Sequence, residues 1–198
     1  YGEVVIALPA TDDAHPAFSS LFVQTELILN QHAIICSRRP RSKAEHPPWM
    51  FHLMKLAEGD ADNISYETDR DKFIGRGNTI TNPKALHQLE PLSNSQGSVL
   101  DPIISIQYRI TIDEEETSII DIVTGIAENR SGCQALLDKY QDRNFRNRAF
   151  ELSWTYREVV LRQINATETD AQLYGRLASS VIFTNPTVRA NKDILIKN

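Results

Sequence analysis

Apolar and polar residues alternate along much of the first two thirds of the chain, as is typical of β-strands with one buried face. The clearest example is Ile104–Ile112, where every even position is apolar and every odd position is polar. This pattern predicts a strand with one buried and one solvated face. Similar runs predict further strands at residues 3–8, 21–29, 33–38, 49–57 and 118–126. We expect seven or more strands with no helix between them, which favours an antiparallel sandwich over an α/β sheet.

Short polar segments connect the predicted strands. Asn30–His32 has the length of a hairpin loop, and Pro9–Asp13 has the composition of a turn. The acidic segment Asp113–Glu116 is expected to turn strand 104–112 back onto strand 118–126 as its partner.

After Ala127 the apolar period changes to that of helices. Ser131 and Gln134 have the spacing of a capping box for a helix that runs to Tyr140. A second helix carries an apolar stripe of Phe145, Ala149, Leu152, Tyr156, Val159 and Ile164. Residues 167–170 are expected to cap a third helix, with Leu173, Leu177, Val181 and Ile182 on its inner face and Asn185-Pro186 at its end.

The change of period predicts two domains, a β-sandwich at 1–128 and a helical segment at 129–198. The helical third is too small to form a closed core by itself. We therefore expect it to pack against the sandwich or against a further domain.

The chain has 198 residues and a formal charge of −5, which argues against nucleic-acid binding, because phosphate neutralisation needs a basic face. One basic run, residues 38–43, is expected to be a solvated loop that faces the acidic segment 113–116. Cys36 and Cys133 have no metal-ligand spacing, and buried reduced thiols are expected, although a disulfide between them remains open. No stretch suits a membrane span or a signal peptide. The absence of an initiator methionine suggests a soluble piece of a longer protein.

The stretch Ile64–Thr79 concentrates acids, arginines and glycines. Gly75-Arg76-Gly77 lacks the remaining residues of a nucleotide-binding loop. Glu67 and Asp69 would share one strand face, closer together than the paired carboxylates of glycosidases. A structural corner is the favoured interpretation. The five histidines form no triad or metal set, so we predict no catalytic residue, no metal site and no cofactor.

The two tryptophans are candidates for sugar stacking, because an aromatic face matches the C–H face of a sugar ring. Trp49 follows Pro47-Pro48 at the start of a predicted strand, and Trp154 lies on the second predicted helix. Packing in a core or an interface is the competing interpretation for both.

Six segments in the same order resemble the N-terminal region of the inverting phosphorylases of glycoside hydrolase family 94, formerly glycosyltransferase family 36. Within this family, the sequences of the segments are most similar to the phosphorylase-like part of cyclic β-1,2-glucan synthases. The segments are HPAFSSLFVQTE (15–26), CSRRPRS (36–42), ISYETDRDKFIGRGNT (64–79), PLSNSQGSVLDPI (91–103), VTGIAENR (123–130) and LASSVIF (177–183).

The resemblance implies an antiparallel β-supersandwich of the galactose-mutarotase type, followed by linker helices and then by an (α/α)₆ barrel with the catalytic acid and the phosphate site. The barrel has no counterpart in these residues, so no catalytic residue is carried over. The resemblance also implies a location on the cytoplasmic side of the inner membrane, as part of a larger membrane protein.

Three hypotheses follow. The first is a non-catalytic domain that binds a β-glucan oligosaccharide or polysaccharide and supports the catalytic barrel, with Trp49, Tyr66, Asp69, Arg70 and Arg76 as candidate sugar contacts. The second is a purely structural domain for interdomain docking or for a homodimer, without sugar contact. The third, an independent hydrolase or mutarotase-like enzyme, lacks the converging acid and base groups that it would need.

Overall fold

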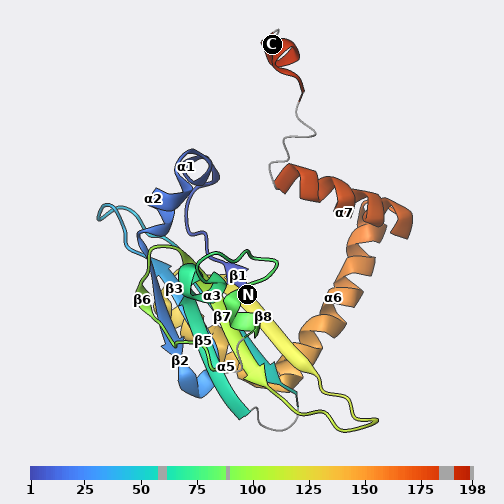
Figure 1. Ribbon diagram of the computed structural model, residues 1–198. Helices are drawn as coiled ribbons and strands as arrows, with labels where there is room; N and C mark the ends of the chain where they lie inside the picture. The colour runs from blue at the N-terminus through green and yellow to red at the C-terminus, as the bar shows by residue number, and fades with distance from the viewer. Residues whose placement is uncertain (58–61, 88–89, 183–189, 197–198) are drawn as a thin grey trace. The chain divides into compact units, whose positions relative to one another are not determined.

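The structure is a computed structural model that describes residues 1–57, 62–87, 90–182 and 190–196 (Figure 1). The chain divides into two compact units, Tyr1–Arg146 and Asn147–Asn198. Each unit is described by itself below.

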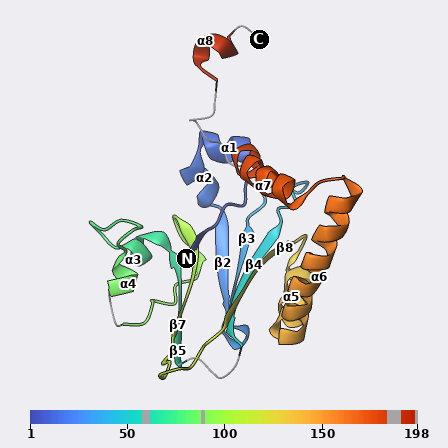
Figure 2. The ribbon, with the colours of Figure 1, turned by 90° about the vertical axis from the view of Figure 1, so that its right-hand side faces the viewer.

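The first unit contains two antiparallel β-sheets, as the alternating pattern predicts. The three-stranded sheet has the order β1 (Gly2–Glu3), β7 (Pro102–Arg109) and β5 (Asp62–Asp69). The five-stranded sheet has the order β6 (Gly97–Ser98), β2 (Val23–Ile28), β3 (Ala33–Arg38), β4 (Trp49–Leu56) and β8 (Ile120–Ala127). Figure 2 shows the two sheets nearly edge-on, with the helices of segment 70–87 outside the three-stranded sheet and helix 130–141 outside the five-stranded sheet.

Helices are more extensive than the sequence pattern suggests, with 40% of the described residues in helix and 28% in strand. Short helices precede β2 and follow β5, so the expectation of strands without intervening helices was wrong. Pro9–Asp13 lies in a helix, not in a turn, because proline is well suited to a first helical position. The helices are α1 (Pro9–Ala14), α2 (Pro16–Ser20), η1 (Leu29–Gln31), α3 (Arg70–Ile74), α4 (Lys84–His87), α5 (Arg130–Gln141), α6 (Arg143–Gln163), α7 (Glu168–Ile182) and α8 (Lys192–Leu195).

Of the two predicted hairpins, one is confirmed and one was wrong. β2 and β3 pair along their whole length, and His32 adopts the left-handed conformation at the turn. β7 and β8, in contrast, lie in different sheets: β8 pairs with β4 from Leu56↔Ile120 to Trp49↔Ala127, and β7 pairs with β5. Alternation shows which residues face a core, but it does not identify the partner strand.

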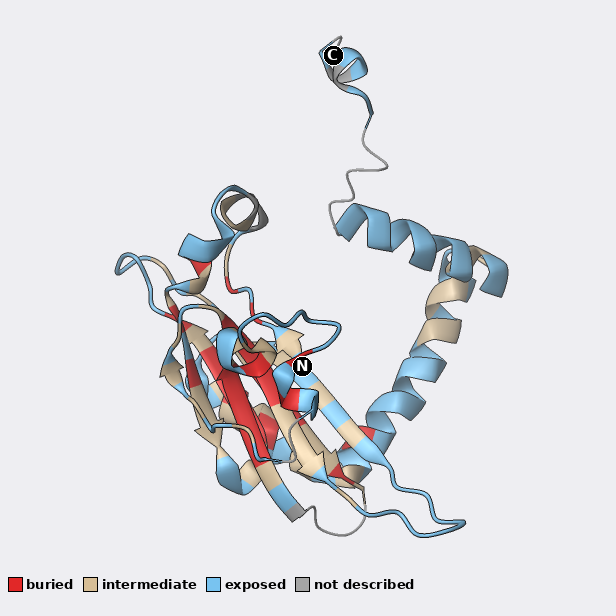
Figure 3. Cartoon of the chain, viewed as in Figure 1, coloured by how far each residue is buried: buried red, intermediate tan, exposed pale blue. Residues whose placement is uncertain are grey.

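The main core lies between the two sheets, and buried residues are drawn in red in Figure 3. Its buried members are Val4, Ile6, Val23, Ile34, Cys36, Tyr66 and Ile104. Ile103, which directly precedes Ile104 in β7, is fully buried on the other face of that sheet, together with Phe73 of α3 and Ala85 of α4. Both faces of β7 are therefore covered at this end, so the expected solvated face holds only farther along the strand.

Helix α5 covers the other face of the five-stranded sheet. Cys133 and Leu137 pack there against Ala33, Ile35, Phe51 and Leu53. Cys36 lies in the inter-sheet core and Cys133 on the opposite face of the sheet, and both are buried free thiols. The disulfide that the sequence left open is therefore absent.

The last strand, β8, ends at Ala127 and α5 begins at Arg130, whereas the first compact unit continues to Arg146. The Arg146 side chain is 3% exposed, and its Nε donates to Asp121 Oδ2 of β8 over 2.7 Å. Its Nη1 donates to the carbonyl oxygens of Tyr140 and Gln141. These bonds fix the start of α6 to β8 and to the end of α5.

The helix caps match the sequence prediction in one case of two. The α5 N-cap is Asn129, whose Oδ1 accepts from the Gly132 amide at 2.8 Å. Ser131 was therefore wrongly assigned as this cap. At α7, Thr167 and Asp170 form the predicted reciprocal cap, with Asp170 Oδ2 accepting from the Thr167 amide at 2.8 Å.

The described residues of the second unit form most of α6, all of α7 and α8, and short connections between them. An ion pair between Arg157 and Glu168 joins α6 to α7. The predicted apolar stripes of both helices are present but exposed; Tyr156 is 70% and Val181 84% exposed. The predicted helix end at Asn185-Pro186 lies outside the described residues. None of the helices in the described ranges is long and apolar enough to cross a membrane.

Candidate functional site

The corner where β5 meets α3 is organised around the carboxylate of Glu67, a residue that is 2% exposed. Its Oε1 accepts from the backbone amides of Thr68 at 3.0 Å and Asp69 at 3.1 Å, and from the hydroxyl of Ser95. Its Oε2 accepts from the hydroxyl of Ser93 at 2.6 Å and from the Ser93 amide at 3.4 Å. Five donors therefore replace the water that a buried carboxylate loses.

Buried threonines extend this hydrogen-bond network to the other sheet. Thr68 Oγ1 donates to the Ser95 carbonyl at 2.9 Å, and Thr25 Oγ1 of β2 donates to Thr68 Oγ1 at 2.8 Å. The Gly97 amide donates to Thr25 Oγ1 at 3.2 Å. The network joins β5, the segment 93–97 and β2, so its role in the described residues is structural.

Asp69 and Arg70 are engaged in the same corner. Asp69 is the N-cap of α3 and accepts from the Asp71 amide at 3.0 Å. Arg70 pairs with Glu3 and with Asp101, each at 3.4 Å. These contacts connect α3 to β1 and to the segment before β7, which agrees with the interpretation of this stretch as a structural corner.

Arg76 lies between two glycines with positive φ, Gly75 at 79° and Gly77 at 80°. A Cβ at Gly75 would lie 2.7 Å from Lys84 Cβ, so this position requires glycine. Arg76 is exposed and makes no hydrogen bond or ion pair with another described residue. It is therefore the most accessible of the five candidate sugar contacts.

The remaining two candidates lie in packed surroundings. Tyr66 is 3% exposed within the inter-sheet core, so neither ring face is open to a sugar, and burial raises its pKa. Trp49 is half-buried and packs against the cluster beneath α5. The structure thus brings Asp69 and Arg70 together in one corner and does not gather the five candidates into one site.

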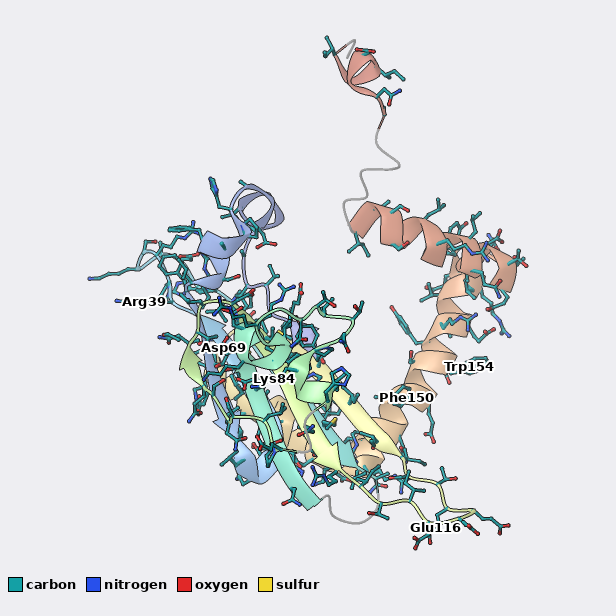
Figure 4. All side chains as sticks on the ribbon, viewed as in Figure 1. Arg39, Asp69, Lys84, Glu116, Phe150 and Trp154 are labelled. Carbon is teal, nitrogen blue, oxygen red and sulfur yellow. The ribbon has the colours of Figure 1, made fainter. Side chains whose placement is uncertain are left out.

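The two charged segments do not face each other. Segment 39–48 follows β3 and precedes Trp49, whereas segment 110–119 precedes Ile120, which pairs with Leu56 at the other end of β4. The labelled residues Arg39 and Glu116 mark these two ends in Figure 4. The first arginine of the basic run is not solvated: Arg38 is 7% exposed and donates to the Ile6 carbonyl at 3.3 Å.

An apolar groove lies where the two sheets diverge, and sequence reasoning missed it. Its volume is about 450 Å³, and its lining includes Met54, Phe73, Ile80, Leu86, Tyr108 and Ile120. At its base, Tyr108 donates to the Met54 carbonyl, and its hydroxyl lies 2.8 Å from His32 Nδ1. Burial raises the pKa of Tyr108. The groove therefore has an apolar lining with a satisfied polar pair beneath it.

Next to the groove, β8 exposes isoleucines on the face that points toward the three-stranded sheet. Ile120 is 41%, Ile122 61% and Ile126 70% exposed. They alternate with half-buried residues that face α5, and Figure 3 shows this alternation along the strand. Because the five-stranded sheet is the wider of the two, this part of its inner face lies uncovered in the described residues.

Helix α6 exposes an aromatic pair one turn apart. Phe150 is 74% and Trp154 65% exposed, and both are labelled in Figure 4. The guanidinium carbon of Arg157 lies 5.5 Å from the Trp154 ring centroid. Trp154 is therefore the more accessible tryptophan. The exposed rings of Phe150 and Trp154 are wide enough for a sugar ring to stack on them.

The described residues contain no group of three His, Cys, Asp or Glu side chains arranged to hold a metal ion. The buried acid Glu67 has no ion-pair partner among them, and no second acid faces it. The features that the described residues do form are the hydrogen-bonded corner around Glu67 and the exposed apolar surfaces of β8 and α6.

The family model for the supersandwich domain of glycosyl hydrolase 94 matches residues 1–143, and the chain therefore belongs to this family. A further comparison identifies one relative. The chain is 28% identical over 193 residues to the cyclic β-(1,2)-glucan synthase NdvB of Rhizobium meliloti (strain 1021). The match covers 98% of this chain and 7% of that protein. The chain thus spans a small part of its relative's length.

Proposed function

We propose that the chain is a non-catalytic scaffolding module of a β-glucan-processing enzyme. In this role it supports other parts of the enzyme and does not itself react with sugar. The observation that carries the proposal is the exposed apolar surface: the isoleucines of β8 in the first unit and the stripes of α6 and α7 in the second. Isolated monomers seldom expose large apolar patches, so such surfaces indicate contact with other protein.

Three of the five candidate sugar contacts support the same view. Tyr66 is in the core, Asp69 caps a helix, and Arg70 is ion-paired. These roles account for the residues without a ligand. The corner around Glu67 then serves to hold β5, β2 and α3 in a fixed arrangement.

The catalytic partner in this proposal is an (α/α)₆ barrel, which the family resemblance implies. The supersandwich would have the galactose-mutarotase type of topology, and the helices α6 and α7 would connect it to the barrel. By the same resemblance, we place the module on the cytoplasmic side of the inner membrane. A homodimer contact is an additional possible use of the apolar surface.

A second candidate function, glycan holding, is favoured by one observation: the exposed pair Phe150 and Trp154 with Arg157 beside it. A sugar ring can stack on the face of an exposed aromatic side chain, and a guanidinium can donate hydrogen bonds to sugar hydroxyl groups. Arg76 is the corresponding candidate in the first unit.

The test uses a cyclic β-1,2-glucan synthase of this family expressed whole, with substitutions at the positions that correspond to these residues. Scaffolding predicts that Ile122→Lys together with Ile126→Lys lowers the yield of assembled enzyme, whereas Trp154→Ala and Arg76→Ala leave the KM for glucan unchanged. A KM raised tenfold or more by Trp154→Ala or Arg76→Ala, with normal assembly, would support glycan holding and contradict the proposal.

A further inference from the structure

The three-stranded sheet has an edge that is paired along only part of its length. β1 has two residues and pairs with β7 at Gly2↔Ile104 and Glu3↔Ile103. β7 continues to Arg109, and its other edge is paired with β5 as far as Asp62↔Arg109. Among the described residues, no strand pairs with the β1 side of Ser105–Tyr108.

The unpaired edge borders the apolar groove. Ser105, Ile106, Gln107 and Tyr108 all line the groove. On one side it is bounded by Met54 and Ile120 of the five-stranded sheet, and on the other by Ile80 and Leu86 from the α3–α4 region. Ile122 continues the exposed apolar surface along β8. An unpaired backbone edge and an uncovered apolar surface thus coincide.

We propose that this edge accepts one further β-strand, which runs antiparallel to β7 and in line with β1. The strand is supplied by another part of the same polypeptide, and it closes the sandwich over Met54 and Ile120. This inference rests on the proposed scaffolding role and specifies the first partner of that surface. An exposed sheet edge binds an extended segment through main-chain hydrogen bonds, while alternate side chains enter apolar surroundings.

The register of β1 defines the chemistry of the incoming strand. If the pairing of Gly2 with Ile104 continues, the next positions lie opposite Ser105, Ile106, Gln107 and Tyr108 in turn. Those opposite Ile106 and Tyr108 share the inter-sheet face and are expected to be apolar. The end of the strand beyond Arg109 lies toward the exposed acidic segment 113–116, so a basic residue is expected there.

Other occupants fit the groove less well. A sugar needs hydroxyl partners, but the lining is predominantly apolar and the Tyr108 hydroxyl is already engaged. A relative of which this chain matches 7% has ample polypeptide to supply a strand. A second copy of the chain is the remaining source, and the experiment distinguishes it.

The experiment adds five residues, Lys-Thr-Val-Thr-Val, before Tyr1 of the full chain, so that the two valines lie opposite Tyr108 and Ile106. The matched control adds Lys-Thr-Asp-Thr-Asp, which has the same length but places charges on the apolar face. Thermal unfolding of both proteins is compared, and hydrogen exchange is measured for the amides of Ile106 and Tyr108, which face the β1 side of β7 as the Pro102 carbonyl does. Both measurements are repeated with Ile120→Lys, and the unextended chain is examined by sedimentation.

We expect the valine extension to raise the midpoint of unfolding by about 4 °C or more over the aspartate control. Exchange of the β7 edge amides should slow at least tenfold, and Ile120→Lys should remove most of the gain. Equal midpoints and unprotected amides would overturn the proposal. A dimer of the unextended chain that Ile120→Lys dissociates would overturn the assigned source by placing a second copy on this surface. Sugar binding elsewhere would contradict the scaffolding role without changing these readouts.

Discussion

At the scale of single residues, Glu67 is a buried carboxylate that depends on several hydrogen-bond donors in the first unit. Its carboxylate is buried and accepts hydrogen bonds from the amides of Thr68 and Asp69, from the Ser93 and Ser95 hydroxyls and from the Ser93 amide. Removing a buried hydrogen-bonded carboxylate leaves its donors unpaired. We therefore expect Glu67→Ala to lower the free energy of unfolding by about 3 kcal/mol, measured by urea denaturation. Glu116→Ala, in the exposed acidic segment, is the control and should change it by less than about 0.5 kcal/mol.

His52 predicts a dependence of stability on pH. Burial lowers its pKa from 6.5 to about 4. Between these values the unfolded chain binds a proton that the folded chain does not, so stability falls as pH decreases from 6.5 to 4. Below pH 4 this loss is complete, and above pH 6.5 it is absent.

The measurement is the free energy of unfolding at pH 7, 5.5 and 4.5 for the native chain and for His52→Gln. Glutamine can keep a hydrogen bond to Thr124 Oγ1, which lies 2.8 Å from His52 Nδ1. We expect the variant to lose less stability than the native chain over this range. An equal loss in both proteins would show that His52 does not carry this dependence.

At the scale of elements, the α5 cap provides a direct test of the structure against the sequence pattern. Asn129 accepts from the Gly132 amide, while Ser131 donates its hydroxyl to Asn129 Oδ1 at 2.6 Å. Asn129→Ala should therefore destabilise the chain by about 1 kcal/mol, and Ser131→Ala should change stability by less than about 0.5 kcal/mol. The reverse order of effects in chemical denaturation would restore the sequence-based assignment.

The sequence predicted the type of most long elements and the pairing of β2 with β3, but it missed the partners of β7 and β8. Alternating residues located β2, β3, β4, β7 and β8, because burial of one strand face leaves a two-residue period. The same signal could not show that β8 pairs with β4 across more than 60 residues of chain, since pairing depends on the whole sandwich. It also missed the helices α1 and α3, which are too short for a helical period to be distinguished.

At the scale of the whole molecule, the limits of the first unit can be tested by shortening the chain. A protein of residues 1–152 keeps all three buried clusters and keeps Arg146 within the helix. We expect it to unfold cooperatively, with a midpoint within about 5 °C of that of the full chain.

A protein of residues 1–142 is the matched comparison, because it lacks Arg146. It leaves Asp121, whose side chain is 17% exposed, without its guanidinium partner. Breaking a buried pair in this way is strongly destabilising, and we expect a loss of about 3 kcal/mol. Equal stability of the two shortened proteins would contradict the role assigned to Arg146.

The candidate site was harder to predict than the fold. Arg70 of the corner where β5 meets α3 pairs with Glu3 and Asp101, which are distant along the chain, and not with Asp69. The glycines that favour the interpretation of the stretch 64–79 as a structural corner were visible in the sequence. The donors to Glu67 were not, since Ser93 and Ser95 are 26 and 28 residues away along the chain. The cluster of polar residues at 93–96 was the available signal, but nothing in it indicates which side chain it encloses.

The central claim, that the chain supports other domains and does not hold glucan, is tested most directly by calorimetric titration with β-1,2-linked gluco-oligosaccharides, with cello-oligosaccharides as the control. We predict no saturable heat up to millimolar ligand on a folded sample. Saturable binding that is selective for the β-1,2 series, and that Trp154→Ala or Arg76→Ala abolishes, would contradict the claim and identify the chain as a glucan-holding domain.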